Sequence, residues 1–171
     1  GLSSWRSPEG GYYIWSYLED VLAVLNALEL EKVTLLGHSM GGAIAGLFAS
    51  LFPAMVDKLV LLDCVGPLAT EPEAAPAQML RALQQPQSLR ASYRNYYPGF
   101  DEAVQARAAK GLSFAAATIL GKRGIARDDS GYYWAMDPRL SMANMMSLSE
   151  TQVAAFLQAI VSPGLLIAAP G

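Results

Sequence analysis

Residues 13–63 alternate between helical and extended segments, and this alternation limits the possible folds more than any other feature of the sequence. Apolar residues recur at helical spacing over 13–30, which predicts an amphipathic helix. The short apolar runs 33–36 and 59–62 are bounded by turn residues and favour buried strands. Residues 42–52 are apolar on every face, which is typical of a helix buried between layers. This order, with short connections, predicts a parallel sheet with helices packed on its faces.

The charge-free run Val33–Val56 raises a second interpretation, because it is long enough for a helix that spans a membrane. Helix-disrupting residues interrupt the run, namely Gly37, Gly41, Gly42, Gly46 and Pro53. A strand, a turn and a buried helix explain this composition better. We therefore expect a soluble protein without a membrane span.

The composition argues against several partners. The 171 residues are 53% hydrophobic and 16% charged, with a net charge of −3 and no basic stripe of the kind that binds nucleic acid. Cys64 is the single cysteine and cannot form an intramolecular disulfide. No signal peptide is visible, so we expect a cytoplasmic location. The sequence indicates no metal or cofactor and does not reveal the oligomeric state.

After the second predicted strand the character of the chain changes. A proline-rich stretch begins near residue 66, and the segment 67–147 is helical in pieces, with a polar, glycine-punctuated loop expected over 121–131. The final segment, 148–171, resumes with an amphipathic helix and a third apolar run, 165–169, which predicts another buried strand. We expect a sheet domain, 1–66 with 148–171, interrupted by a helical insertion over 67–147.

Polar residues at three helix starts predict caps. Asp101 precedes a helical segment that Gly111 ends, and Ser113 precedes a short helix expected to stop at Gly121. Ser149 and Gln152 have the spacing of a capping box ahead of the last helix.

The stretch G37-H-S-M-G41 fits the pattern G-x-S-x-G, with a predicted strand before it and a predicted helix after it. In such a turn Ser39 is a candidate nucleophile on a strained backbone, and Gly37 and Gly41 are expected to avoid clashes. The backbone N–H of Met40 is a candidate donor to a developing oxyanion, helped by the helix dipole. The alternative is a glycine-rich turn that binds a phosphate or nothing, but neither phosphate-binding glycine pattern matches.

The chain resembles the α/β-hydrolases in the segments G1-L-S-S4, L35-L-G-H-S-M-G-G42 and V56-D-K-L-V-L-L-D63. More narrowly, the chain is similar to the serine hydrolase-like protein family in G1-L-S-S4, P53-A-M-V-D-K-L-V-L-L-D63 and I160-V-S-P-G-L-L-I-A168. The resemblance is weakest over 68–110. It implies an α/β-hydrolase fold with an eight-stranded, mostly parallel sheet, in which 33–36, 59–62 and 165–169 are strands five to seven. It also implies a helical cap inserted after strand six.

A serine nucleophile needs a general base, usually a histidine oriented by a carboxylate. The only histidine is His38, next to Ser39 on the same turn, and we expect it to pack against the sheet and not to act as the base. The resemblance places the base after strand eight and the second oxyanion donor after strand three, so we expect the chain to be an internal fragment. It places the acid after strand seven or after strand six, where Asp63 stands; Asp63 is alternatively a structural residue that accepts loop N–H bonds.

Other residues have two interpretations each. Arg81, Arg90 and Arg94 either line a cap over an anionic substrate or lie on a solvated helix face, which we favour. The aromatic run 132–134 either walls an acyl pocket or anchors the cap. Cys64 is expected to be a small buried hydrophobic residue.

These features favour a serine hydrolase that acts on a small-molecule ester or related acyl compound through an acyl-enzyme on Ser39. We expect the chain by itself to be inactive. The alternative is a non-catalytic binding or scaffold protein on the same fold.

Overall fold

The computed structural model describes residues 3–7, 10–85 and 94–168. The chain divides into two compact units. One comprises Tyr12–Leu83 and Ala143–Gly171 and contains a three-stranded sheet; the other comprises Gly1–Gly11 and Gln84–Met142. None of the described helices is long and apolar enough to cross a membrane.

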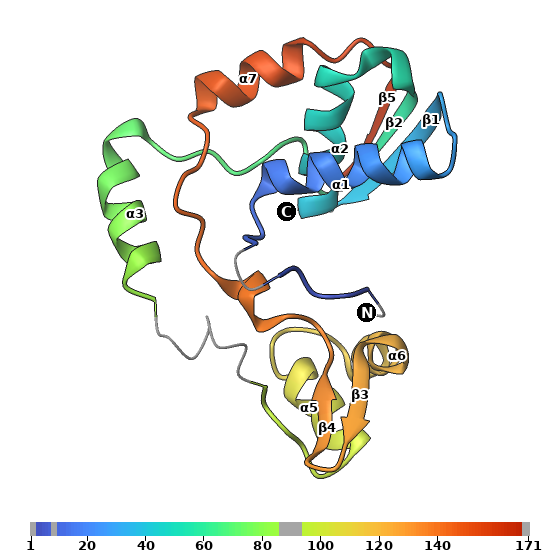
Figure 1. The fold of residues 1–171 in the computed structure, drawn as a ribbon, viewed down its shortest axis with the longest axis vertical. Coiled ribbons are helices and arrows are strands. Elements are labelled where there is room, and N and C mark those ends of the chain that lie inside the picture. The colour runs from blue at the N-terminus through green and yellow to red at the C-terminus, as the bar shows by residue number, and fades with distance from the viewer. Residues whose placement is uncertain (1–2, 8–9, 86–93, 169–171) are drawn as a thin grey trace. The chain divides into compact units, whose positions relative to one another are not determined.

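The sheet has the strand order β1-β2-β5, with β1 at Val33–His38, β2 at Val56–Leu62 and β5 at Gly164–Ile167 (Figure 1). Both strand pairs are parallel, and their registers align His38 with Leu62 and Leu62 with Ile167. The three strands predicted from the sequence therefore exist and lie in neighbouring positions. The prediction that the third strand is buried is wrong, because all four residues of β5 are exposed at the edge of the described sheet. Parallel neighbours bring their carboxyl ends to one edge of the sheet.

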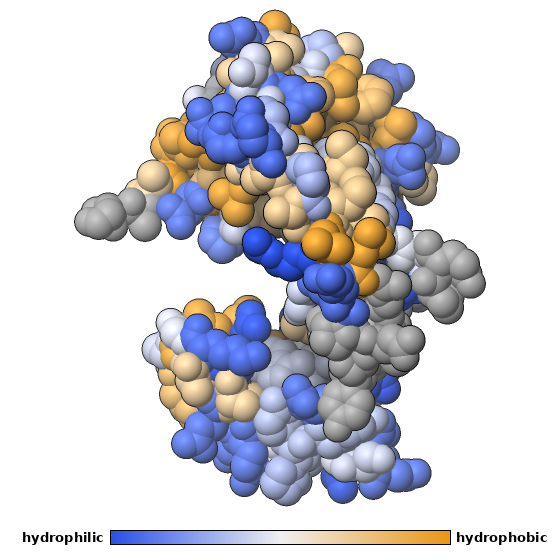
Figure 2. All heavy atoms as spheres, turned by 90° about the vertical axis from the view of Figure 1, so that its left-hand side faces the viewer, coloured by the Kyte–Doolittle hydropathy of each residue, from blue (hydrophilic) through white to orange (hydrophobic). Residues whose placement is uncertain are grey.

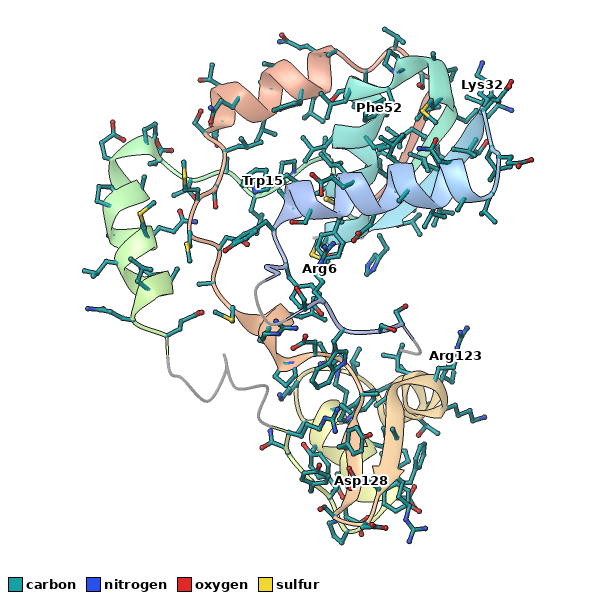
Figure 3. All side chains as sticks on the ribbon, viewed as in Figure 1. Arg6, Trp15, Lys32, Phe52, Arg123 and Asp128 are labelled. Carbon is teal, nitrogen blue, oxygen red and sulfur yellow. The ribbon has the colours of Figure 1, made fainter. Side chains whose placement is uncertain are left out.

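Two helices complete the core of this unit. Helix α1 spans Ile14–Ala27 and α2 spans Met40–Leu51, and α2 is buried over eight consecutive residues from Gly42 to Ala49. Phe48 has no exposed surface and packs its ring 4.7 Å from that of Phe52, which Figure 3 labels. Complete burial of such a side chain contributes about 1.5–3 kcal/mol. The buried helix expected over 42–52 is confirmed.

Two further helices flank the sheet unit. Helix α3 spans Ala75–Leu83, after the short 3₁₀ turn η2 at Pro72–Ala74, and α7 spans Glu150–Gln158. The capping box of α7 is confirmed, because the Ser149 side chain accepts a hydrogen bond from Gln152 N and the Gln152 side chain accepts one from Ser149 N. Part of the segment 67–147, which the sequence predicts to be helical in pieces, falls on residues 86–93, and these lie outside the described residues.

The second unit is not purely helical. It contains α5 (Phe100–Ala108), α6 (Phe114–Gly124) and an antiparallel pair, β3 (Ile125–Asp128) and β4 (Gly131–Trp134), followed by the 3₁₀ turn η3 (Pro138–Ser141). The prediction of a loop over 121–131 is therefore wrong. The helix does not stop at Gly121, and a hairpin takes the place of the loop.

The turn of this hairpin explains why its sequence is so polar. The Asp128 carboxylate accepts a hydrogen bond of 2.9 Å from Ser130 N, and Gly131 adopts φ 126°. Turn residues of this type supply local hydrogen bonds and positive φ at low cost. A Cβ at Gly131 would also lie 2.7 Å from Tyr97 O.

The caps in this unit follow the expectations in part. Ser113 caps α6, since its side chain accepts a hydrogen bond from Ala116 N at 3.2 Å. Asp101 does not cap α5. Gly99 is the N-cap residue, and Asp101 lies in the first turn, where a negative charge still interacts favourably with the helix dipole.

The N-terminal segment is fastened to this unit by side chains. Trp5 Nε1 donates to Ala135 O at 2.9 Å, and the Arg139 guanidinium donates to the carbonyl oxygens of Arg6 and Ser7 at 2.6 and 2.9 Å. The same guanidinium pairs with Asp137, which is 2% exposed, at 2.7 Å. Figure 3 labels Arg6.

The two units do not coincide with the expected domains. The residues 67–83 and 143–147 group with the sheet, and residues 1–11 group with the second unit. Domain limits at 66 and 147 remain a prediction.

Candidate active site

Ser39 lies on the sharp turn between β1 and α2 and is exposed. Its backbone adopts φ 51° and ψ −122°, a conformation that is strained for any residue except glycine. Hydrogen bonds on both sides hold this turn. Ser39 N donates to Leu62 O at 3.1 Å, and Gly42 N and Ala43 N donate to Ser39 O at 2.8 and 3.1 Å.

Three glycines surround this serine, and they differ in what they provide. A Cβ at Gly37 would lie 2.5 Å from the carbonyl carbon of Gly41 and 2.6 Å from Gly42 N, so only glycine fits there. A Cβ at Gly42 would lie 3.0 Å from the Cβ of Cys64. At Gly41 an added Cβ meets no atom of the described chain within 4 Å. Gly37 therefore has the expected role, whereas a steric need at Gly41 is not found and the tight second position is Gly42.

The backbone N–H of Met40 opens helix α2. The first N–H groups of a helix have no acceptor within it, and here Gly42 N and Ala43 N already bind Ser39 O. The N–H groups of Met40 and Gly41 therefore remain as donors at the positive end of the helix dipole, next to the Ser39 side chain. This arrangement is suited to an oxygen that gains negative charge.

Asp63 directly follows β2, as Ser39 directly follows β1. It is exposed, its backbone has φ 52°, and its N–H donates to Ile167 O at 2.7 Å. Asp63 and Ser39 line one cavity at the carboxyl ends of adjacent parallel strands.

Two expectations about neighbouring residues are wrong. His38 is exposed and does not pack against the sheet. Within the described ranges, no hydrogen bond joins His38 to Ser39. Cys64 is only partly buried, and its thiol donates a 3.2 Å hydrogen bond to Gly66 O, because the chain turns sharply after β2.

Ser39 opens into a cavity of about 1160 Å³ within the sheet unit. Besides Ser39, Met40 and Asp63, its walls include Trp15 at the start of α1, labelled in Figure 3, and residues of α3 and α7. The sequence reasoning did not assign α3 and α7 to the site. The available signal was a repeat of small and apolar residues at helical spacing in both segments.

The remaining candidates divide between the two units. Arg81 lines the cavity but is exposed. Arg94 belongs to the other unit, where its guanidinium carbon lies 4.6 Å from the ring centroid of Trp5 and 4.4 Å from that of Tyr133. Arg90 lies outside the described residues. Trp134 donates from Nε1 to Ala103 O at 3.0 Å, which is a contact within the second unit. The two interpretations of the aromatic run therefore stay predictions.

Among the described residues, no group of three or more His, Cys, Asp and Glu side chains is placed to hold a metal ion.

Comparisons with known proteins identify the family to which this fold belongs. Residues 1–157 match the family model described as "alpha/beta hydrolase fold". The chain belongs to the alpha/beta hydrolase fold family. A serine hydrolase-like protein of Danio rerio is 30% identical over 175 residues, which cover 99% of this chain and 53% of the relative. The human serine hydrolase-like protein is 46% identical over 63 residues, which cover 37% of this chain and 31% of that protein.

Solved structures show the same fold. The hypothetical protein PA1622 of Pseudomonas aeruginosa PAO1 superimposes with a TM-score of 0.92 and 32% identity, over 99% of this chain and 60% of that one. The thioesterase domain from the curacin biosynthetic pathway superimposes with a TM-score of 0.71 and 25% identity, over 92% of this chain and 57% of that domain. The expected α/β-hydrolase fold and the similarity to serine hydrolase-like proteins are confirmed. The chain spans about half the length of the Danio rerio relative.

Proposed function

We propose that the whole protein is a serine hydrolase that cleaves a carboxylic ester or a related acyl compound through an acyl-enzyme on Ser39. The observation that carries this proposal is the strained backbone of Ser39 (φ 51°) at the mouth of a large cavity, directly before a helix N-terminus. Strain at a single exposed residue is typical of functional sites, because the surrounding structure must hold it in place. Membership of the alpha/beta hydrolase fold family supports the same chemistry.

In the proposed reaction Ser39 Oγ attacks the carbonyl carbon of the substrate. The carbonyl oxygen becomes an oxyanion, which accepts hydrogen bonds from Met40 N–H and from a second donor. The bond to the leaving alcohol then breaks, and water hydrolyses the acyl-enzyme and restores Ser39. A general base takes the Ser39 proton and transfers it to the leaving alcohol.

The base and the second oxyanion donor are proposed to lie in parts of the whole protein that this chain does not cover. The side chain of His38 is exposed and makes no hydrogen bond to Ser39 within the described chain. Asp63 is proposed as the acid that orients the base, because it lines the same cavity as Ser39. We expect residues 1–171 alone to show no Ser39-dependent esterase turnover, and measured turnover would place the base within this chain.

A fluorophosphonate probe tests the proposed nucleophile. The full-length protein should be labelled, and Ser39→Ala should abolish the labelling; the variant Ser50→Ala, on the following helix, is the control and should be labelled normally. If the wild type is not labelled, or if Ser39→Ala is labelled equally, the hydrolase proposal fails. That result would favour a binding or scaffold protein on the same fold.

A further inference from the structure

Two helices present matching faces to the cavity beside Ser39. From η2 and α3 the lining residues are Ala74, Ala77, Gln78 and Arg81. From α7 they are Glu150, Val153, Ala154 and Leu157. Both sets follow the spacing i, i+3, i+4, i+7, so each is one continuous stripe along its helix.

Each stripe carries one charged residue, at one end, and the other residues are small or apolar apart from Gln78. The charged residues around the cavity are Arg81, Glu150 and Asp63, and all three are exposed. Among the described residues, the cavity therefore offers no buried cation for an anionic substrate and no buried anion for a cationic one. Its partly buried lining includes Ile14, Val153 and Leu157.

Backbone and side-chain hydrogen bonds hold α3 in place as a wall. Gln78 Nε2 donates to Asn144 O at 3.1 Å and to Ser147 Oγ at 2.8 Å, and Thr70 N donates to Leu148 O at 2.9 Å. Met79 and Leu80 of α3 do not line the cavity and are 40% and 55% exposed. Figure 2 faces the side of the molecule on which Figure 1 shows α3, and hydrophobic surface is visible there. Gln78 is thus a positioning residue for the cavity wall.

We propose that this cavity binds the acyl part of the substrate as a long, uncharged hydrocarbon chain, such as decanoyl, that runs from Ser39 between α3 and α7. This inference rests on the proposed function, because it names the substrate class of the same site. The cavity volume of about 1160 Å³ exceeds what an acetyl group fills. Ligand pockets of about 300–1,000 Å³ bury whole drug-sized molecules. Ala77 of α3 and Ala154 of α7 line the cavity with small, exposed side chains, so a larger side chain at either position would fill part of the cavity.

The experiment measures kcat/KM of the full-length protein for p-nitrophenyl esters from acetate to dodecanoate. We expect a rise of about two- to fourfold for each added methylene up to a limiting length, since a buried methylene is worth at most about 0.8 kcal/mol. Ala154→Trp should lower the ratio of kcat/KM for decanoate to kcat/KM for acetate about tenfold, equivalent to about 1.4 kcal/mol. It should also shift the limiting chain length to shorter esters. The matched control is Ala155→Trp on the same helix; Ala155 is exposed and does not line the cavity, so the series should not change.

A second measurement separates this inference from the proposed function. Isothermal titration calorimetry measures the Kd of 1-decanol and of 1-butanol for the Ser39→Ala variant, and this measurement requires no catalysis. Decanol should bind more tightly, and Ala154→Trp should weaken its binding while Ala155→Trp should not. If decanol binds in this way but no ester is cleaved, the hydrolase proposal fails and the cavity assignment stands.

Other outcomes overturn the assignment itself. These are Ser39-dependent cleavage with a flat chain-length series, equal effects of the two tryptophan variants, or no preference for decanol over butanol. Ala154→Leu provides a milder variant with a smaller shift in the same direction, should Ala154→Trp not fold. Gln78→Leu should raise KM for the decanoate ester more than it lowers kcat, because the variant loses the hydrogen bonds that hold α3. Gln78→Asn has a shorter side chain and should not restore the KM. A normal KM in Gln78→Asn would show that Gln78 does not position the wall through these two hydrogen bonds.

Discussion

Ser39 keeps its backbone at φ 51° and ψ −122°, which glycine adopts freely and which costs other residues about 1–3 kcal/mol. The hydrogen bonds from Ser39 N to Leu62 O and from Gly42 N to Ser39 O force this conformation. The hydroxyl is thereby held at the surface, where the peptide N–H groups of the next helix also point. The strained backbone of Ser39 therefore lowers the stability of the fold while it keeps the hydroxyl exposed, as the proposed nucleophile requires.

This strain predicts an order of stability between two variants that both lack the hydroxyl. Ser39→Gly should be more stable than Ser39→Ala by about 1 kcal/mol, because relief of strain exceeds the entropy that glycine adds to the unfolded chain. Chemical unfolding of the full-length protein measures the difference. The control pair is Ser50→Gly and Ser50→Ala within α2. There the alanine variant should be the more stable one, by about 1 kcal/mol in the free energy of unfolding. An alanine variant at Ser39 that matches or exceeds the glycine variant would show that the turn is unstrained.

The glycines of the turn give a second prediction at this scale. Gly37→Ala should lower the free energy of unfolding by about 1–3 kcal/mol, since its Cβ would overlap the backbone of Gly41 and Gly42. Gly41→Ala should change it by less than about 0.5 kcal/mol, as expected where no contact is disturbed. Unfolding in urea measures both. Equal losses for the two variants would contradict the steric difference.

The sequence predicted the strained turn at Ser39, between a strand and a helix, correctly because the pattern of strand, glycine and helix is local. The role of Ser39 as a nucleophile stays a prediction. It did not distinguish Gly41 from Gly42, because the distinction depends on Cys64, which lies more than twenty residues further along the chain. Spacing along a chain does not reveal which Cβ positions a neighbouring strand occupies. The exposure of His38 was missed for the same reason.

At the scale of elements, the apolar pattern predicted the long helices and the existence of the three strands of the sheet, but not that β5 is exposed in the described chain. The hairpin of β3 and β4 was missed. Its strands are short and only partly buried, and polar residues 127–130 surround its turn, so no period of two stood out. The stripes on α3 and α7 were present in the sequence, but only their shared cavity identifies them as parts of one site.

The ion pair beside η3 supplies a prediction for the second unit. Arg139→Met should lower the free energy of unfolding by about 1.5–3 kcal/mol, because it removes the charge-assisted hydrogen bonds from the guanidinium to the buried carboxylate of Asp137. The exposed pair Lys32–Asp57, with side chains 57% and 50% exposed, is the control, and Lys32→Met should cost less than about 1 kcal/mol. Thermal unfolding of both variants measures the contrast. Similar small losses would mean that the carboxylate of Asp137 is satisfied without Arg139.

At the scale of the whole molecule, the site depends on more chain than its own residues. The described sheet has three strands, in the order β1-β2-β5, and every catalytic candidate lies at the carboxyl end of one strand or in the turn after it. A sheet of this kind places the ends of several strands around one crevice. The chain spans about half the length of the Danio rerio relative, so further groups of the reaction are proposed to come from the rest of the whole protein.

The edges of the described sheet lead to a prediction about residues 1–171 expressed alone. Both β1 and β5 are edge strands there, and Leu165, Leu166 and Ile167 are 49–55% exposed. An exposed, apolar edge strand pairs readily with other copies. We expect this chain to form soluble aggregates at concentrations at which the full-length protein is monodisperse by light scattering. Leu166→Lys should reduce the aggregation, because a charge on an edge strand opposes pairing, whereas Leu166→Ile should not. A monodisperse 171-residue chain, or equal behaviour of the two variants, would mean that these strand edges are not the surfaces that associate.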